Sequence, residues 1–132
     1  MTHLKVVVRF KDGSVKKGTA QNFSPENVSF HLLTSSGQAV LVIMEELKAV
    51  FFVKDYLGNK LRKDINQISR NNFQTGTGRM IRVIFSDDEM IVGYSTGYSP
   101  NRQGFFVKPA DQEGNNERIF IITSATKRVE LL

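Results

Sequence analysis

The chain of 132 residues contains no cysteine and no tryptophan. Without cysteine it has no disulfide framework, no thiolate nucleophile and no cysteine-ligated zinc site. A reducing compartment suits such a composition, so we expect a cytoplasmic location. The stretch from Met1 to Lys5 lacks the apolar core of a signal peptide, and no apolar run approaches the roughly 20 residues of a membrane span. We therefore expect neither a secretion signal nor a membrane span.

Groups that carry catalysis or bind metals are also scarce. The only histidines are His3 and His31, and neither has a neighbouring cysteine or histidine with which to share a metal. The segment 76–79 (Gly-Thr-Gly-Arg) precedes a strand instead of following one, so it is not a dinucleotide-binding fingerprint. The acidic run 87–89 falls at a hairpin turn, and the loop 111–117 lacks the alternating ligands of a calcium site. We expect a protein that is not an enzyme, with no metal and no cofactor.

What the sequence does contain is an internal repeat. The apolar stretch 40–53 returns in altered form at 119–131, with Val40 corresponding to Ile119 (119 − 40 = 79). Earlier positions correspond at a spacing of 75, so the loop 111–117 is expected to be about four residues longer than its counterpart. Matches at fixed spacing predict a duplicated unit. The matched pairs are Phe10 and Phe85, Asp12 and Asp87, Gly18 and Gly93, Pro25 and Pro100, and Phe30 and Phe105.

Each unit has the pattern of short β-strands. Apolar residues alternate with polar ones from Leu4 to Phe10, and Asp12-Gly13 then marks a hairpin. A glycine within a strand marks a bend or bulge, as we expect at Gly18. Phe30 and Leu32 are expected on one face of their strand, with His31 exposed on the other. The expected elements of the first unit are strands at 4–11, 15–21, 27–34, 39–44 and 48–53, with one 3₁₀ turn at 45–47.

The first unit resembles the first sequence motif of Sm-like proteins, through the run 6–13 (Val-Val-Val-Arg-Phe-Lys-Asp-Gly) followed by Gly18, Phe23 and Asn27. The resemblance implies an all-β fold with two tandem five-stranded SH3-like or Sm-like small barrels. It departs from RNA-binding Sm-like proteins, which carry an Arg-Gly pair before the last strand. The segments 48–55 and 104–109 are also similar to uncharacterised bacterial proteins. The expected domains are a first barrel at 1–54, a partly irregular basic linker at 55–78, and a second barrel at 79–132.

The linker supplies much of the net charge of +5. Basic groups that follow phosphates, with aromatic side chains between them, suit RNA or single-stranded DNA. The same charges also suit a linker that is merely solvated, with its aromatics packed on the barrels. The candidate nucleic-acid contacts are Lys60, Arg62, Lys63, Arg70 and Tyr56, with Phe73 as a second stacking residue.

Two phenylalanine pairs suggest interaction with protein. In Phe51-Phe52 and Phe105-Phe106 both alternating faces are apolar, so one ring enters its own barrel and the other needs cover. That cover is the sister barrel, the linker, a second copy of the chain or another protein.

We therefore expect a non-catalytic protein-interaction or scaffold module, with a protein partner or a homodimer. RNA or single-stranded DNA binding through the linker and a barrel face is the alternative. A further alternative is a small anionic ligand such as a cyclic dinucleotide. The segment 27–32 resembles part of a PilZ motif for such ligands, but it lacks the final glycine and the upstream arginine pair.

Overall fold

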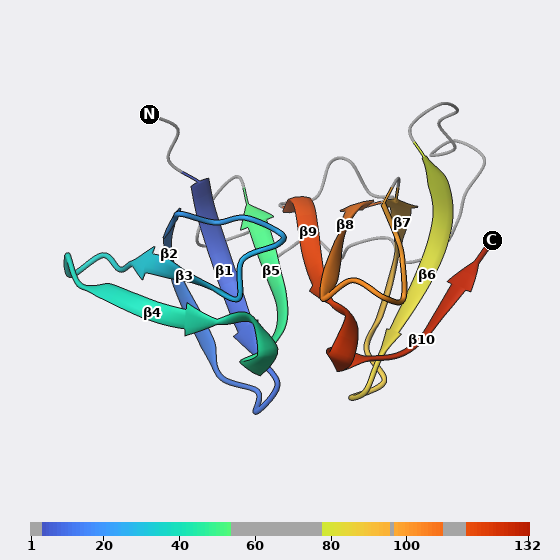
Figure 1. Ribbon diagram of the computed structural model, residues 1–132, viewed down its shortest axis with the longest axis horizontal. Coiled ribbons are helices and arrows are strands. Elements are labelled where there is room, and N and C mark those ends of the chain that lie inside the picture. Colours follow the sequence, from blue (N-terminus) through green and yellow to red (C-terminus); the bar gives the residue numbers. More distant parts are fainter. Residues whose placement is uncertain (1–3, 54–77, 96, 110–115) are drawn as a thin grey trace, which may run out of the picture.

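The computed structural model describes residues 4–53, 78–95, 97–109 and 116–132, and these fold entirely into strands, turns and two short 3₁₀ helices (Figure 1). The all-β expectation is confirmed. No helix in these ranges is long and apolar enough to cross a membrane. The first half contains β1 (Leu4–Phe10), β2 (Val15–Gln21), β3 (Ser29–Leu33), β4 (Ala39–Ile43), η1 (Met44–Glu46) and β5 (Leu47–Val53). The second half contains β6 (Arg79–Phe85), β7 (Met90–Ser95), β8 (Gly104–Pro109), β9 (Asn116–Ile122), η3 (Thr123–Ala125) and β10 (Thr126–Leu131).

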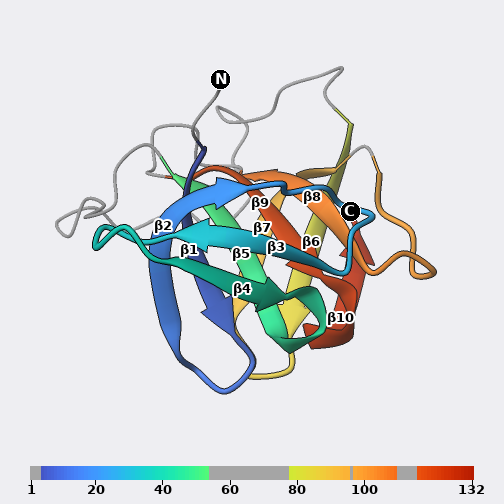
Figure 2. The same ribbon diagram turned by 60° about the vertical axis from the view of Figure 1, so that its left-hand side comes forward.

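The ten strands form one antiparallel sheet in the order β10-β6-β7-β8-β9-β5-β1-β2-β3-β4. The expectation of two tandem five-stranded small barrels is not confirmed, because β5 pairs with β9 and one sheet continues through both halves. Within each half the order is the same: the last strand lies beside the first, and the others follow in sequence. Figure 1 shows the two halves on either side of β5 and β9, and Figure 2 shows β2, β3 and β4 succeeding one another across the first half.

The hairpins that open the two halves make the same hydrogen bonds. The Phe10 amide donates to the Ser14 carbonyl at 2.9 Å, and the Phe85 amide donates to the Glu89 carbonyl at 2.8 Å. In each turn an aspartate side chain accepts from the backbone amide two residues ahead, which is the usual reason for aspartate in such turns. The second turn has an aspartate, Asp88, at positive φ (72°) where the first has glycine. Asparagine and aspartate tolerate this left-handed backbone better than other side chains do.

Two glycines let neighbouring strands approach closely at matching places. Gly18 of β2 pairs with Val6 of β1, and Gly93 of β7 pairs with Ile81 of β6. A Cβ atom at Gly18 would collide with the backbone oxygen of Leu33, and one at Gly93 would collide with the backbone oxygen of Lys108. The bend expected at these glycines therefore coincides with a close backbone contact, and a side chain at either position would have to displace it.

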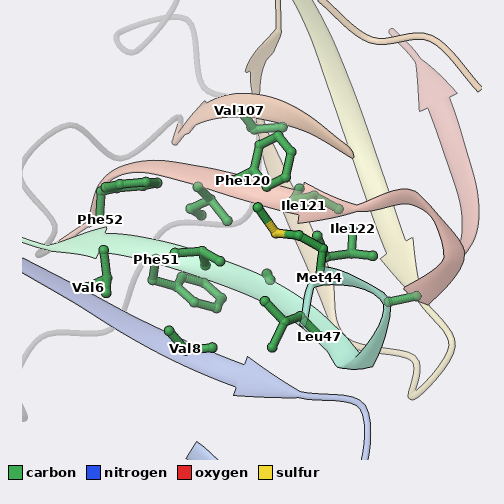
Figure 3. Close-up of a cluster of buried hydrophobic side chains, with 14 of the residues drawn as sticks. Val6, Val8, Met44, Leu47, Phe51, Phe52, Val107, Phe120, Ile121 and Ile122 are labelled. Atoms are coloured by element: carbon green, nitrogen blue, oxygen red, sulfur yellow. The ribbon is translucent and has the colours of Figure 1, made fainter. Parts of the chain in front are cut away.

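Strand β5 lies between two parts of one hydrophobic core, and all seven of its residues are buried. The side chains of Val50 and Phe52 lie on the same face of the sheet as the buried Val8 of β1, so they pack in the first half. Phe51 lies on the opposite face and pairs with the buried Ile119 of β9. Figure 3 shows part of this core, where side chains of both halves gather between β1, β5 and β9. The two halves therefore share their interior.

Candidate interaction surface

The four phenylalanines predicted to contact a partner are instead covered by the chain itself. Phe51 is 7% exposed, Phe52 3% and Phe105 2%. The ring of Phe106 is half-buried and lies 6.0 Å from the ring of Phe52 and 5.0 Å from that of Phe120, measured between centroids. Of the covers considered from the sequence, the sister half is therefore the one observed, and these rings do not form a free interaction surface.

A further aromatic residue, Phe23, completes this contact between the halves. It follows β2, and its ring makes edge contacts with Phe30 and Phe52 of the first half at 5.3 and 5.2 Å. It also contacts Phe120 and Phe106 of the second half at 5.3 and 6.2 Å. Edge-to-face pairs stabilise a core beyond the burial of their area, so Phe23 ties the two halves together.

The opposite end of the junction is polar. The buried ammonium group of Lys48, in β5, donates to Asp87 at 2.7 Å and also to Glu89, both in the first turn of the second half. The hydrogen bond from Lys48, together with one from the Glu89 backbone amide, lowers the pKa of Asp87. Arg9 lies 3.7 Å from the Glu89 carboxylate. The carboxylates of Asp87 and Glu89 neutralise a buried cation, so these two residues of the acidic run have a structural role.

An open hollow of about 670 Å³ lies where the turns of the two halves meet. Gln103 donates from its side-chain amide to the carbonyl oxygens of Pro25 and Asn27, at 2.6 and 2.7 Å. The charged groups that line the hollow, Glu26 and Arg102, are both exposed and opposite in sign. The lining thus offers no excess positive charge to an anionic ligand. Within the described ranges, no group of three histidine or acidic side chains could hold a metal ion.

The structure does not test the predicted nucleic-acid contacts of the basic linker. Lys60, Arg62, Lys63, Arg70 and Tyr56, together with Phe73, lie outside the described residues, so nucleic-acid binding there stays a prediction. In the PilZ-like segment, Phe30 and Leu32 are buried while His31 is exposed, as the alternation predicted. This is the burial pattern of an ordinary half-buried strand.

Strand β4 forms one open end of the sheet. Among the described strands it pairs with β3 alone, and none of its five residues is charged. Its side chains Leu41 and Ile43 are 57% and 41% exposed. The Met44 amide donates to the Val28 carbonyl and the Gln38 carbonyl accepts from the Thr34 amide, so even-numbered positions bond to β3. In an antiparallel ladder the odd-numbered positions then point their amides and carbonyls toward the open edge.

The counterpart of β4 in the second half is β9, and it is covered. At a spacing of 79, Leu41 corresponds to Phe120 and Ile43 to Ile122. Phe120 is fully buried and Ile122 is 2% exposed, because the first half packs against them and β5 pairs with their strand. The same apolar face is thus buried in one half and open to solvent in the other.

The other open end of the sheet, β10, is charged. Arg128 and Glu130 occupy the positions that Ala49 and Phe51 hold in β5. Glu130 binds the Arg82 guanidinium at 3.0 Å and that of Arg128 at 3.4 Å. Charged side chains on an edge strand oppose the addition of another strand, so the two ends of the sheet differ in character.

Comparison with known proteins places the chain in a family. A model of a family of unknown function, DUF6982, matches residues 2–132. The chain belongs to DUF6982. Searches of curated proteins and of solved structures found no match.

In this DUF6982 chain, sequence reasoning missed Leu41 and Ile43 as surface residues. The run 40–43 is apolar at every position, which is typical of a strand buried on both faces. The predicted interaction residues were the bulky phenylalanine pairs. The exposed apolar surface lies instead on β4, at an edge that the sequence did not predict to be open.

Proposed function

We propose that this DUF6982 protein is a non-catalytic protein-interaction module that binds an extended strand of protein at the open edge of β4. In this proposal each half is one small SH3-like or Sm-like barrel of a duplicated unit. The pairing of β5 with β9 of the second barrel is the example of how the first barrel binds a strand at β4. In strand addition, backbone hydrogen bonds supply affinity, and alternating side chains supply specificity. The β4 edge offers three outward-facing residues for those bonds, at positions 39, 41 and 43.

The observation that carries the proposal is the contrast between β4 and β9. Strand β9 presents the same alternation as β4 and receives β5, with Val50 opposite Phe120 and Phe51 opposite Ile119. Strand β4 presents Leu41 where β9 presents Phe120, and no strand of the described residues pairs with its outer edge. An uncharged open edge is a template for pairing that proteins usually protect, so its retention here supports a binding role.

The non-catalytic part of the proposal is supported by how the acidic side chains are used. Asp87 and Glu89 bind the buried Lys48, and Asp88 binds Lys127 at 2.9 Å. Each of these carboxylates thus has a structural partner. In addition, the chain has no cysteine to serve as a nucleophile.

The test uses the strand that β9 binds as a probe for β4. A synthetic peptide with the β5 sequence Leu47–Val53, flanked by lysines for solubility and labelled with a fluorophore, is titrated with the protein. We expect its fluorescence anisotropy to rise with protein concentration and the rise to be lost in Leu41→Lys. Val15→Lys is the matched control, because Val15 is 48% exposed but lies at the far end of β2, away from β4.

Two results would count against the proposal. One is an anisotropy that stays flat up to the highest soluble protein concentration. The other is equal binding by the wild type and by Leu41→Lys, which would place the peptide elsewhere. A scrambled peptide of the same composition separates pairing from simple hydrophobic adsorption, since only the ordered sequence keeps the alternation.

A further inference from the structure

We infer that the strand bound at β4 is the β4 strand of a second copy of the chain, paired antiparallel about a two-fold axis at Leu41. This inference rests on the proposed function, because it names the partner of the same edge. It predicts a homodimer in which the sheet continues from one molecule into the next.

The hydrogen-bonding pattern of β4 suits a two-fold axis at its centre. Positions 39, 41 and 43 direct their amides and carbonyls to the open edge, as the bonds at Met44 and Gln38 establish. When Leu41 lies opposite Leu41 of the second copy, Ala39 lies opposite Ile43 of the second copy. By symmetry, Ile43 lies opposite Ala39 of the second copy. All three outward-facing positions then meet an outward-facing position, so every free donor and acceptor of the strand gains a partner.

The charges on the sheet ends favour this partner over the other end of a second copy. Joining β10 to β4 in the β5–β9 register would set Arg128 against Val42 and Glu130 against Val40 of the next molecule. Val42 is 1% exposed, so the ion-paired charges of β10 would meet an apolar face. Burying charges there has a large desolvation cost. Pairing β4 with β4 brings no charged residue of either strand into the contact.

The side chains also match. Leu41 and Ile43 lie on the outer face of β4. In the dimer Leu41 stands beside Leu41 of the second copy, and Ile43 stands opposite the small Ala39 of the second copy. Leu41 and Ile43 are two of the six large hydrophobic side chains that are at least two-fifths exposed among the described residues. Pairing like with like about a two-fold axis closes after two copies, whereas a β4-to-β10 contact would generate rings or open chains.

The absence of cysteine makes a direct test available. Leu41→Cys introduces the only thiol in the chain, and the dimer sets it beside its own copy. Leu41 and its copy form a hydrogen-bonded pair, whose Cα atoms lie about 5.5 Å apart, and this distance is within the span of a disulfide. Under mild oxidation we expect Leu41→Cys to form a covalent dimer rapidly at micromolar concentration. Leu131→Cys is the control, because Leu131 on β10 is 51% exposed against 57% for Leu41, and this variant should remain largely monomeric.

Sedimentation velocity over a range of concentrations measures the association without a new bond. We expect a concentration-dependent dimer in the wild type and in Leu131→Lys. In Leu41→Lys two like charges would lie directly opposite each other, so the dissociation constant should rise by about tenfold or more. Circular dichroism of each variant checks that it is folded.

The outcomes separate the inference from the proposed function. A wild type that is monomeric at every concentration, but binds the β5 peptide, overturns the inference and leaves strand binding at β4 standing. A monomer that binds no peptide overturns both. A dimer lost in Leu131→Lys and kept in Leu41→Lys also overturns the inference, because it would place the contact at β10.

Discussion

The close contacts at Gly18 and Gly93 give the most direct test of the packing. Replacing glycine by alanine in an unstrained strand usually stabilises a protein by about 0.4–1 kcal/mol, because it restricts the unfolded chain. At Gly18 the added Cβ would collide with the Leu33 oxygen and lie 3.1 Å from Leu32 Cδ1. At Gly93 it would collide with the Lys108 oxygen and lie 2.6 Å from Val107 Cγ1.

The obstacle in both cases is backbone, which cannot rotate away as a side chain can. Overpacking of this kind costs about 1–3 kcal/mol, so the sign of the usual effect is reversed. We expect each variant, Gly18→Ala and Gly93→Ala, to lose about 2 kcal/mol of unfolding free energy. That loss corresponds to a fall in melting temperature of roughly 8 °C for a chain of this size.

Thermal and urea unfolding followed by circular dichroism measure the loss. Gly97→Ala is the matched control, because a Cβ there would meet nothing within 4 Å. It should change the stability by less than about 0.5 kcal/mol or raise it slightly. If either Gly18→Ala or Gly93→Ala unfolds at or above the wild-type temperature, the close approach of strands inferred at that glycine is wrong.

Three other predictions concern the junction between the halves. Asp87→Asn combined with Glu89→Gln leaves the buried Lys48 without a counter-ion and should lower the free energy of unfolding, measured by urea denaturation, by about 2–3 kcal/mol. Lys48→Met should cost less than about 1 kcal/mol and should restore the stability of the double variant. If it does not, the carboxylates do not stabilise the fold through these ion pairs. Phe23→Ala should cost about 3 kcal/mol, because four rings lose their edge contacts, and a loss below about 1 kcal/mol in calorimetry would contradict this. Since the pKa of Asp87 is lowered in the folded state, its contribution is complete above its ordinary value of 3.8 and is lost as the pH falls through the lower folded value. The melting temperature should therefore fall below about pH 4, and the fall should be smaller in Asp87→Asn, which a pH series of thermal melts would check.

The local structure was largely predictable from the sequence. The alternation that begins at Leu4 predicted β1 to within one residue, and the Asp12-Gly13 turn is where the chain reverses. The 3₁₀ turn expected at 45–47 is present one residue earlier, at Met44–Glu46. These features depend on neighbouring residues alone, so a period of two and a turn motif are enough to specify them.

The arrangement of the edges was not predictable in the same way. A strand that is apolar at every position indicates that both of its faces are buried. Nothing in the segments 40–43 and 119–122 indicates which of these two strands pairs with a further strand. That choice depends on which edges meet in space, which is a tertiary property. The sequence consequently placed the partner contacts at the pairs Phe51-Phe52 and Phe105-Phe106, which the chain buries or half-buries. It overlooked Leu41, which is exposed.

The two-sided burial of β5 sets different mutational tolerances for strands that occupy matching places. From Ala49 to Val53 each residue of β5 faces one part of the core or the other, so both odd and even positions should reject polar substitutions. In β10 none of the six residues is buried, and Lys127, Arg128 and Leu131 are exposed. A saturation scan of the two strands should therefore find an unbroken intolerant segment from Ala49 to Val53 in β5 and a general tolerance of polar residues in β10.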